Sequence, residues 1–187
     1  MIVLVGFMGA GKTTVGRLLA AELGLPFTDA DHKIEQKDGR AIRQIFADDG
    51  EPAFRELEHQ VIAQLLAGPE LVLALGGGAS EHPGTRQQLA TAQVVYLHVS
   101  YAQALARVGG DAGRPMLARP DVQSLHAERE HLYASLATVA IDTDGRAPDE
   151  IVLAILAGLD NTSFTFTRSV AADPDNAEDP VPPEAVE

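Results

Sequence analysis

The chain has no cysteine, no tryptophan and only three tyrosines among its 187 residues. Without cysteine it can form no disulfide, no thiolate metal site and no covalent cysteine intermediate. It also has no apolar run that approaches the roughly 20 residues a membrane-spanning helix needs. A strand-like run begins at Met1, so we expect no signal or transit peptide and a cytoplasmic protein.

Basic residues are also scarce, because 14 lysines and arginines stand against 27 acidic residues and give a formal net charge of −13. Binding to nucleic acid requires clustered lysine and arginine, so this balance argues against such a partner. The C-terminal residues 160–187 carry a net −6, which leaves −7 for the first 159 residues. Any anion site in the folded part must therefore be built from a few locally placed basic residues.

Short apolar runs alternate with helical patterns along the first 160 residues, a length typical of one domain. Strands are expected at residues 1–5, 25–28, 71–75, 94–99 and 139–142. Helices are expected at residues 12–23, 31–37, 41–46, 53–66, 82–90, 101–107, 122–136 and 148–159. Strands that alternate with helices predict an α/β fold whose parallel sheet is covered on both faces.

Three segments do not fit the simple alternation. Residues 32–66 place more helix between the second and third strands than a crossover requires. Residues 107–121 are rich in glycine and arginine, which is typical of a mobile flap, although an ordinary surface loop is the alternative. The proline-rich acidic tail, 161–187, is expected to be disordered because it cannot bury enough apolar surface. Within it, residues 162–167 alternate like a short strand.

Residues 6–13 read Gly-Phe-Met-Gly-Ala-Gly-Lys-Thr, a complete phosphate-binding loop between an expected strand and an expected helix. In such a loop the backbone N–H groups point at the phosphates, Lys12 reaches the β- and γ-phosphates, and Thr13 binds Mg²⁺. A glycine-rich turn without nucleotide is the alternative. The predicted nucleotide-binding residues here are Gly9, Ala10, Gly11, Lys12, Thr13 and Thr14.

Asp29 and Asp31 end the second expected strand, and residues two apart on a strand share a face. Both carboxylates can therefore stand at the edge of the sheet where ligands bind in parallel α/β folds. One would help to hold Mg²⁺, and the other would orient or deprotonate the attacking hydroxyl. The third strand offers no aspartate, so Asp29 is the candidate metal carboxylate. The alternative is that Asp31 caps a helix.

Arg55 and Glu58 lie three apart on one helical face, where a surface ion pair of little consequence is the alternative interpretation. Gly76, Gly77 and Gly78 follow the third strand directly. Three glycines allow a ligand to approach the backbone closely, although a permissive turn would need them too.

Taken in order, these motifs resemble the shikimate kinase family over residues 1–158. The matching pieces are Gly-Phe-Met-Gly-Ala-Gly-Lys-Thr-Thr-Val-Gly, Asp29-Ala30-Asp31, Ile45-Phe46 to Phe54-Arg55-x-x-Glu58, Gly76-Gly77-Gly78, Arg114-Pro115-Met116-Leu117, Arg129-x-x-Leu132-Tyr133, and Asp142-Thr143 to Arg146-x-Pro148. The phosphate-binding loop alone would indicate only a nucleoside triphosphate, whereas the ordered combination is highly specific.

The resemblance implies a three-layer α/β/α P-loop fold of the nucleoside-monophosphate-kinase type. Its five-stranded parallel sheet would carry a substrate-binding helical insertion at 32–66 and a lid at 107–121, within a domain of residues 1–160. It implies that a monomer phosphorylates the 3-hydroxyl of shikimate with ATP and Mg²⁺, in the route to chorismate and the aromatic amino acids.

The resemblance also implies a shikimate site formed by Asp31, Arg55, Arg129 and the backbone of Gly77 and Gly78. Asp31 would accept hydrogen bonds from the ring hydroxyls and act as base or orienter. The planar forks of the two arginines suit the ring carboxylate.

Other residues acquire roles in the same way. Arg114 is similar to the lid arginine that closes over the transferred phosphate, so the implied catalytic residues are Lys12, Asp31 and Arg114. Arg107, Arg146 and Pro148 resemble the residues around adenine. Glu58 resembles the residue that orients Arg55.

Two rival functions are weighed against this one. One is a related kinase that acts on gluconate or a nucleotide, and such a kinase would not need two arginines beside Asp31. A nucleoside acceptor would favour a pocket in which its base stacks on aromatic side chains, and a chain with few aromatic residues is less able to supply one. A non-catalytic nucleotide-binding regulator should lack Lys12, Asp31 or Arg114, and all three are present.

Overall fold

The computed structural model describes residues 1–108 and 121–170, and for residues 162–170 it describes the backbone only. Its centre is a five-stranded sheet in the order β2-β3-β1-β4-β5, and all four neighbouring pairs are parallel. The strands are β1 Ile2–Val5, β2 Phe27–Asp29, β3 Val72–Ala74, β4 Gln93–His98 and β5 Val139–Asp142. The predicted five-stranded parallel sheet is thus confirmed.

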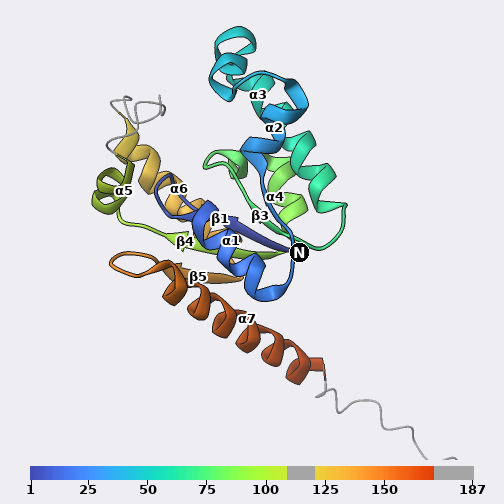
Figure 1. Cartoon of the computed structure of the whole chain (residues 1–187), viewed down its shortest axis with the longest axis vertical. Helices are drawn as coiled ribbons and strands as arrows, with labels where there is room; N and C mark the ends of the chain where they lie inside the picture. The colour runs from blue at the N-terminus through green and yellow to red at the C-terminus, as the bar shows by residue number, and fades with distance from the viewer. Residues whose placement is uncertain (109–120, 171–187) are drawn as a thin grey trace, which may run out of the picture.

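Helices cover both faces of the sheet. They are α1 Lys12–Leu23, α2 Ala30–Asp38, α3 Ile42–Leu66, α4 Pro83–Leu89, α5 Tyr101–Val108, α6 Val122–Leu136 and α7 Pro148–Val170, with a short 3₁₀ turn, η1, at Ala79–Glu81. Figure 1 shows α1 and α7 together in front of the sheet and α6 behind it. None of the helices in the described part of the chain is long and apolar enough to cross a membrane.

The inner strands are buried on both faces, which explains their almost continuous apolar sequence. Val3 and Leu4 of β1, Leu73 of β3, and Val95 and Leu97 of β4 are fully buried. In the register, Val3 pairs with Leu73 on one side and with Val94 on the other. Removing this apolar surface from water is the main stabilising contribution to the sheet.

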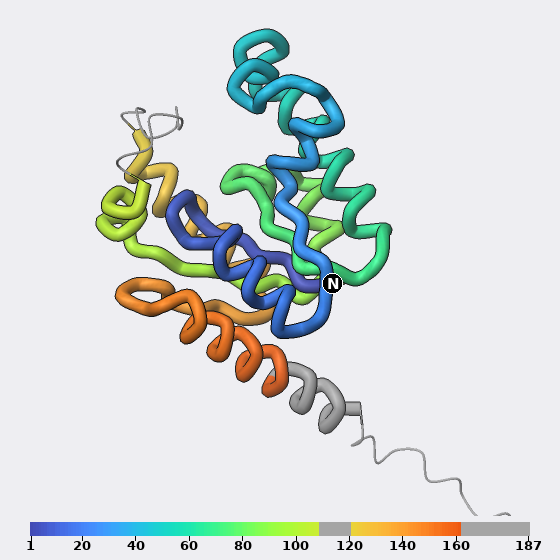
Figure 2. Tube along the Cα trace, in the orientation of Figure 1, coloured from blue at the N-terminus to red at the C-terminus, as the bar shows by residue number. Residues whose placement is uncertain are grey.

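The segment formed by α2 and the first half of α3 projects from the body of the molecule (Figure 2). Its small apolar cluster, formed by Ile34, Ile45, Phe54 and Val61, extends into the second half of α3. The two helices expected at 41–46 and 53–66 form one element, α3, with a break at Gly50, where φ is 82° and ψ is 169°. Gly50 supplies a left-handed φ that other residues rarely adopt, and it separates two helical stretches, as the sequence predicted.

The end of the domain differs from the prediction. Helix α7 continues past residue 159 to Val170, so the alternation at residues 162–167 does not form a strand. Once a helix is nucleated, each added residue gains a hydrogen bond at little further cost, and this favours continuation over a six-residue alternation with no strand to pair with. The rest of the predicted tail, 171–187, and most of the predicted lid, 109–120, lie outside the described residues.

Candidate active site

The phosphate-binding loop connects β1 to α1 at the carboxyl edge of the sheet. Gly9 and Gly11 have φ values of 80° and 90°, in the left-handed region that glycine adopts readily. These two residues allow the backbone to turn into the start of α1. Lys12 Nζ donates hydrogen bonds to the carbonyl oxygens of Gly6 at 2.7 Å and Phe7 at 3.1 Å. The ammonium group is therefore folded onto the loop itself, at the place where phosphates bind in such motifs.

Thr13 and Asp29 form the candidate metal site. Thr13 Oγ1 donates to Asp29 Oδ2 at 2.9 Å, although the two residues lie 16 positions apart in the sequence. Among the described residues there is no cluster of three or more His, Cys, Asp or Glu side chains suited to a metal ion. A hydroxyl and one carboxylate nevertheless fit Mg²⁺, which usually keeps several waters and takes its other ligands from substrate phosphates.

Asp31 lies beside this pair, but for a different geometric reason than the sequence suggested. Strand β2 ends at Asp29 and α2 begins at Ala30, so the two aspartates do not share a strand face. Asp29 is the helix cap, because its Oδ1 accepts a hydrogen bond of 3.1 Å from the backbone N–H of Asp31. The alternative that Asp31 is the cap is therefore wrong, and the strand-to-helix junction brings the carboxylates together.

The environment of Asp31 favours proton uptake. Burial raises the pKa of Asp31, and the neighbouring charge of Asp29 raises it further, while Lys12 and Arg55 act in the opposite direction. A carboxylate with a raised pKa is a better proton acceptor than a solvated one.

Arg55 and Glu58 form a buried pair and not a surface one. Arg55 Nη1 donates to Glu58 Oε2 at 2.7 Å, and the Glu58 side chain is only 2% exposed. Arg55 Nη2 also donates to Glu51 Oε1 at 3.0 Å. Burial raises the pKa of Glu58 to about 7, although the positive charge of Arg55 opposes the shift. The pair holds the guanidinium in one orientation.

The glycines after β3 are required by side chains that pack against them. A Cβ atom on Gly78 would lie 2.2 Å from Arg55 Nη2, and one on Gly76 would lie 2.5 Å from Asp31 Oδ1. The Tyr133 hydroxyl donates to the carbonyl oxygen of Gly77. The loop therefore lies directly against the side chains of Arg55 and Asp31.

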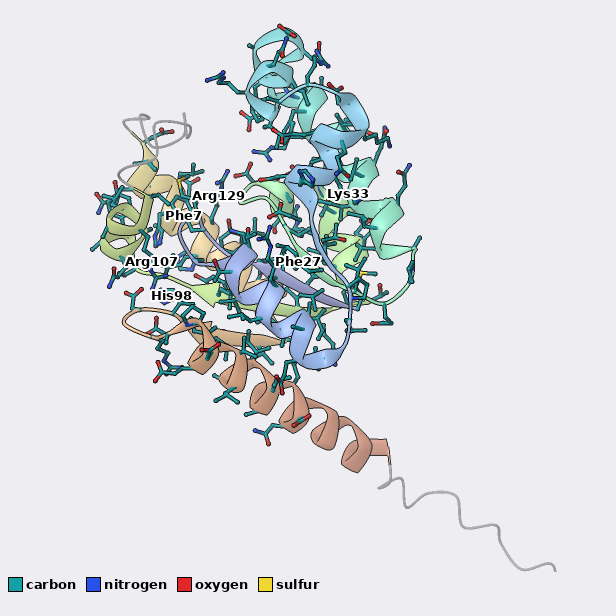
Figure 3. The ribbon with its side chains drawn as sticks, viewed as in Figure 1. Phe7, Phe27, Lys33, His98, Arg107 and Arg129 are labelled. Atoms are coloured by element: carbon teal, nitrogen blue, oxygen red, sulfur yellow. The ribbon has the colours of Figure 1, made fainter. Side chains whose placement is uncertain are left out.

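Arg129 of α6 approaches the same loop from the other side, and its side chain is 6% exposed (Figure 3). Its Nε donates to Glu81 Oε1 at 2.9 Å, and the other oxygen of Glu81 lies 3.7 Å from Arg55 Nη2. The two predicted acceptor arginines therefore meet at one carboxylate. Sequence reasoning missed Glu81, because its two partners come from helices that lie far from it in the sequence.

The predicted adenine residues lie in, next to or in contact with the loop between β5 and α7. Arg107, labelled in Figure 3, donates to the carbonyl oxygen of Gly9 at 3.0 Å and to that of Thr143 at 2.6 Å. It therefore ties α5 to both the phosphate-binding loop and the β5–α7 loop. Arg146 is exposed in that second loop and Pro148 begins α7. Arg114 lies outside the described residues.

The chain is similar to known proteins in both sequence and structure. The sequence model of a family described as shikimate kinase matches residues 8–160. A shikimate kinase from Mycobacterium marinum is 45% identical over 178 residues, which cover 91% of this chain and 97% of that protein. One from Mycobacterium tuberculosis is 47% identical over 161 residues, covering 84% and 92%. A structure of shikimate kinase from Acinetobacter baumannii in complex with shikimate has a TM-score of 0.80 and 40% identity, and the match covers 86% of this chain and 93% of that one.

Proposed function

The chain belongs to the shikimate kinase family, and we propose that it transfers the γ-phosphoryl group of ATP to the 3-hydroxyl of shikimate through the residues described above. The products are ADP and 3-phosphoshikimate, a step on the route to chorismate. The observation that carries this proposal is the convergence of Asp31, Arg55 and Arg129 on the glycine loop beside the phosphate-binding loop.

In the proposed reaction, Thr13 and Asp29 hold Mg²⁺, which when bound offsets the charge of the phosphates. Their hydrogen bond at the carboxyl edge of the sheet supports this assignment. Lys12 turns from the carbonyl oxygens of the loop toward the phosphates. The backbone of the loop, from Gly9 to Thr14, holds the phosphate chain.

Asp31 accepts the proton of the 3-hydroxyl as the hydroxyl oxygen forms its bond to the γ-phosphorus. At the same time the bond from the γ-phosphorus to the oxygen that bridges the β- and γ-phosphates breaks, and that oxygen leaves with ADP. The raised pKa of Asp31 supports this role. Arg114, from the predicted lid, would stabilise the transferred group, while Arg146 and Pro148 would lie at the adenine. Those roles, the cytoplasmic location and the monomeric state stay predictions.

The acceptor carboxylate binds Arg55 and Arg129 in this account. Two arginines beside a carboxylate base suit a cyclic polyol that carries a carboxylate group, and they favour shikimate over a nucleotide acceptor. Glu58 orients Arg55, and the buried 2.7 Å contact between them supports that role. The backbone of Gly77 and Gly78 completes the site.

The acceptor site is tested by Arg55→Lys and Arg129→Lys. Lysine keeps the charge but cannot make a two-pronged contact with a carboxylate, so each change should weaken shikimate binding about tenfold or more. Isothermal titration calorimetry measures the Kd directly, and Arg43→Lys, at an exposed position of α3, is the matched control. If both variants bind shikimate as the parent protein does, the carboxylate lies elsewhere.

A further inference from the structure

Glu81 is the last residue of η1, immediately beyond the glycine loop. Two hydrogen bonds hold the backbone of Glu81 in place. The Glu81 N–H donates to the carbonyl oxygen of Gly78 at 2.9 Å, and Arg86 Nη1 donates to the carbonyl oxygen of Glu81 at 2.7 Å. Its side chain is 37% exposed. The carboxylate can therefore move into solvent by side-chain rotation while η1 keeps its position.

The carboxylate of Glu81 occupies the junction of the two arginines. It accepts a hydrogen bond of 2.9 Å from Arg129 Nε and lies 3.7 Å from Arg55 Nη2. These are the groups that the proposed function assigns to the carboxylate of the acceptor. A second carboxylate brought to the same arginines would meet a like charge, and like charges at contact distance repel each other.

The arginines already contact several carboxyl groups, and this strengthens the competition between Glu81 and the carboxylate of the acceptor. Arg55 already faces Glu58 at 2.7 Å and Glu51 at 3.0 Å. With Glu81 included, three carboxyl groups contact two guanidinium groups. Within the described part of the chain, Glu58 is buried and Glu51 pairs with Arg55 but not with Arg129, so Glu81 is the exposed carboxylate that contacts both arginines.

We propose that Glu81 is an internal competitor of the acceptor carboxylate. In the empty enzyme it bridges Arg55 and Arg129 and keeps them oriented, and it leaves Arg129 when the acceptor binds. This inference rests on the proposed function and adds a determinant of specificity to it. A simple carboxylate displaces Glu81 poorly, whereas an acceptor that also engages Asp31 offsets the cost of displacement.

The test is Glu81→Gln, which keeps the size of the side chain and a neutral acceptor for Arg129. Removing the competing charge should lower the Kd for shikimate, measured by calorimetry without ATP, by about three- to tenfold. The same change should strengthen inhibition by acetate, used as a probe of the arginine pair. Glu56→Gln is the matched control, because Glu56 is 58% exposed and its contacts are with Gln60 and His82 and not with the arginines.

An unchanged Kd for shikimate in Glu81→Gln would show that Glu81 does not compete, and a higher Kd would show that it supports the acceptor. Either result overturns the inference. Glu81→Ala, checked by circular dichroism, gives the same comparison if the glutamine variant does not fold. Absence of shikimate-dependent ADP release by the parent protein would instead count against the proposed function, while acetate binding would still report on Glu81.

Discussion

At the scale of single residues, Glu58 carries a carboxyl group in a place where water does not reach it. The residue is 1% exposed, and burial raises its pKa from 4.5 to about 7. The folded protein therefore binds this proton more tightly than the unfolded chain does. Its contribution to stability is fully present below pH 4.5 and is lost as the pH rises through about 7.

The stability of the parent protein relative to Glu58→Gln should consequently fall between pH 4.5 and pH 8, by up to about 3 kcal/mol. The variant lacks the titrating group, while both proteins share every other pH effect. Urea unfolding at several pH values measures the difference in the free energy of unfolding. A difference that does not change with pH would show that Glu58 keeps its ordinary pKa.

Asp31→Asn should fold normally and lose phosphoryl transfer by about 10²- to 10⁴-fold. The change keeps the size of the side chain and removes the proton acceptor, while the phosphate-binding loop is untouched. We expect kcat to fall by that factor while the Kd for ATP stays unchanged. Near-normal turnover would mean that Asp31 only fills space beside Asp29.

The residues of the site were predicted unevenly, and the reason is physical. Lys12 could be proposed from the phosphate-binding loop and Asp29 from its place after the second strand, whereas the role of Arg55 is implied only by the family resemblance. Glu81 could not be found in this way, since its partners come from α3 and α6, 26 and 48 residues away. Such a contact depends on how the helices pack, which a local pattern does not report.

At the scale of elements, two junctions position the chemistry. The β2–α2 junction places Asp29 and Asp31, and the loop between β3 and η1 lies against Arg55. The sequence predicted the strands and most helices well because apolar periodicity reports burial directly. It predicted the end of α7 less well, because residues 162–167 alternate locally like a strand.

Gly78→Ala should damage the acceptor site without removing any of its functional groups. The new Cβ would lie 2.2 Å from Arg55 Nη2, so the guanidinium must move. We expect the KM for shikimate to rise about tenfold while the KM for ATP stays the same, because the phosphate-binding loop is not touched. Steady-state kinetics with each substrate varied in turn separates the two constants.

Gly77→Ala is the matched comparison, because its Cβ would lie 3.4 Å from the nearest atom, Arg129 Nη1. That is ordinary contact, so its effect on the KM for shikimate should be much smaller. Equal effects of the two substitutions would mean that the loop needs glycine for its backbone and not for the close approach of Arg55.

At the scale of the whole molecule, the folded body ends with the packing of α7. Truncation after Asn161 keeps the buried residues Ile155 and Leu159 and should shift the melting temperature by less than about 3 °C. Truncation after Ala154 removes both and should unfold the protein. Differential scanning fluorimetry compares the two. A large loss of stability after Asn161 would place residues 162–187 within the fold.

The acidic charge of the molecule makes its few basic residues informative. Lys12, Arg55 and Arg129 gather at one edge of the sheet in a chain of net charge −13. Such a concentration in an acidic protein creates a local site for anions while the rest of the surface repels them. The central claim is that these anions are ATP and shikimate.

A coupled assay of ADP release tests that claim most directly. Purified protein with ATP and Mg²⁺ is given shikimate, quinate, gluconate or a nucleoside monophosphate as the acceptor, each at the same concentration. We predict rapid, saturable ADP release with shikimate, at a kcat/KM at least about 100-fold above that of every other acceptor. Faster turnover with gluconate or a nucleotide, or no acceptor-dependent release at all, would contradict the account.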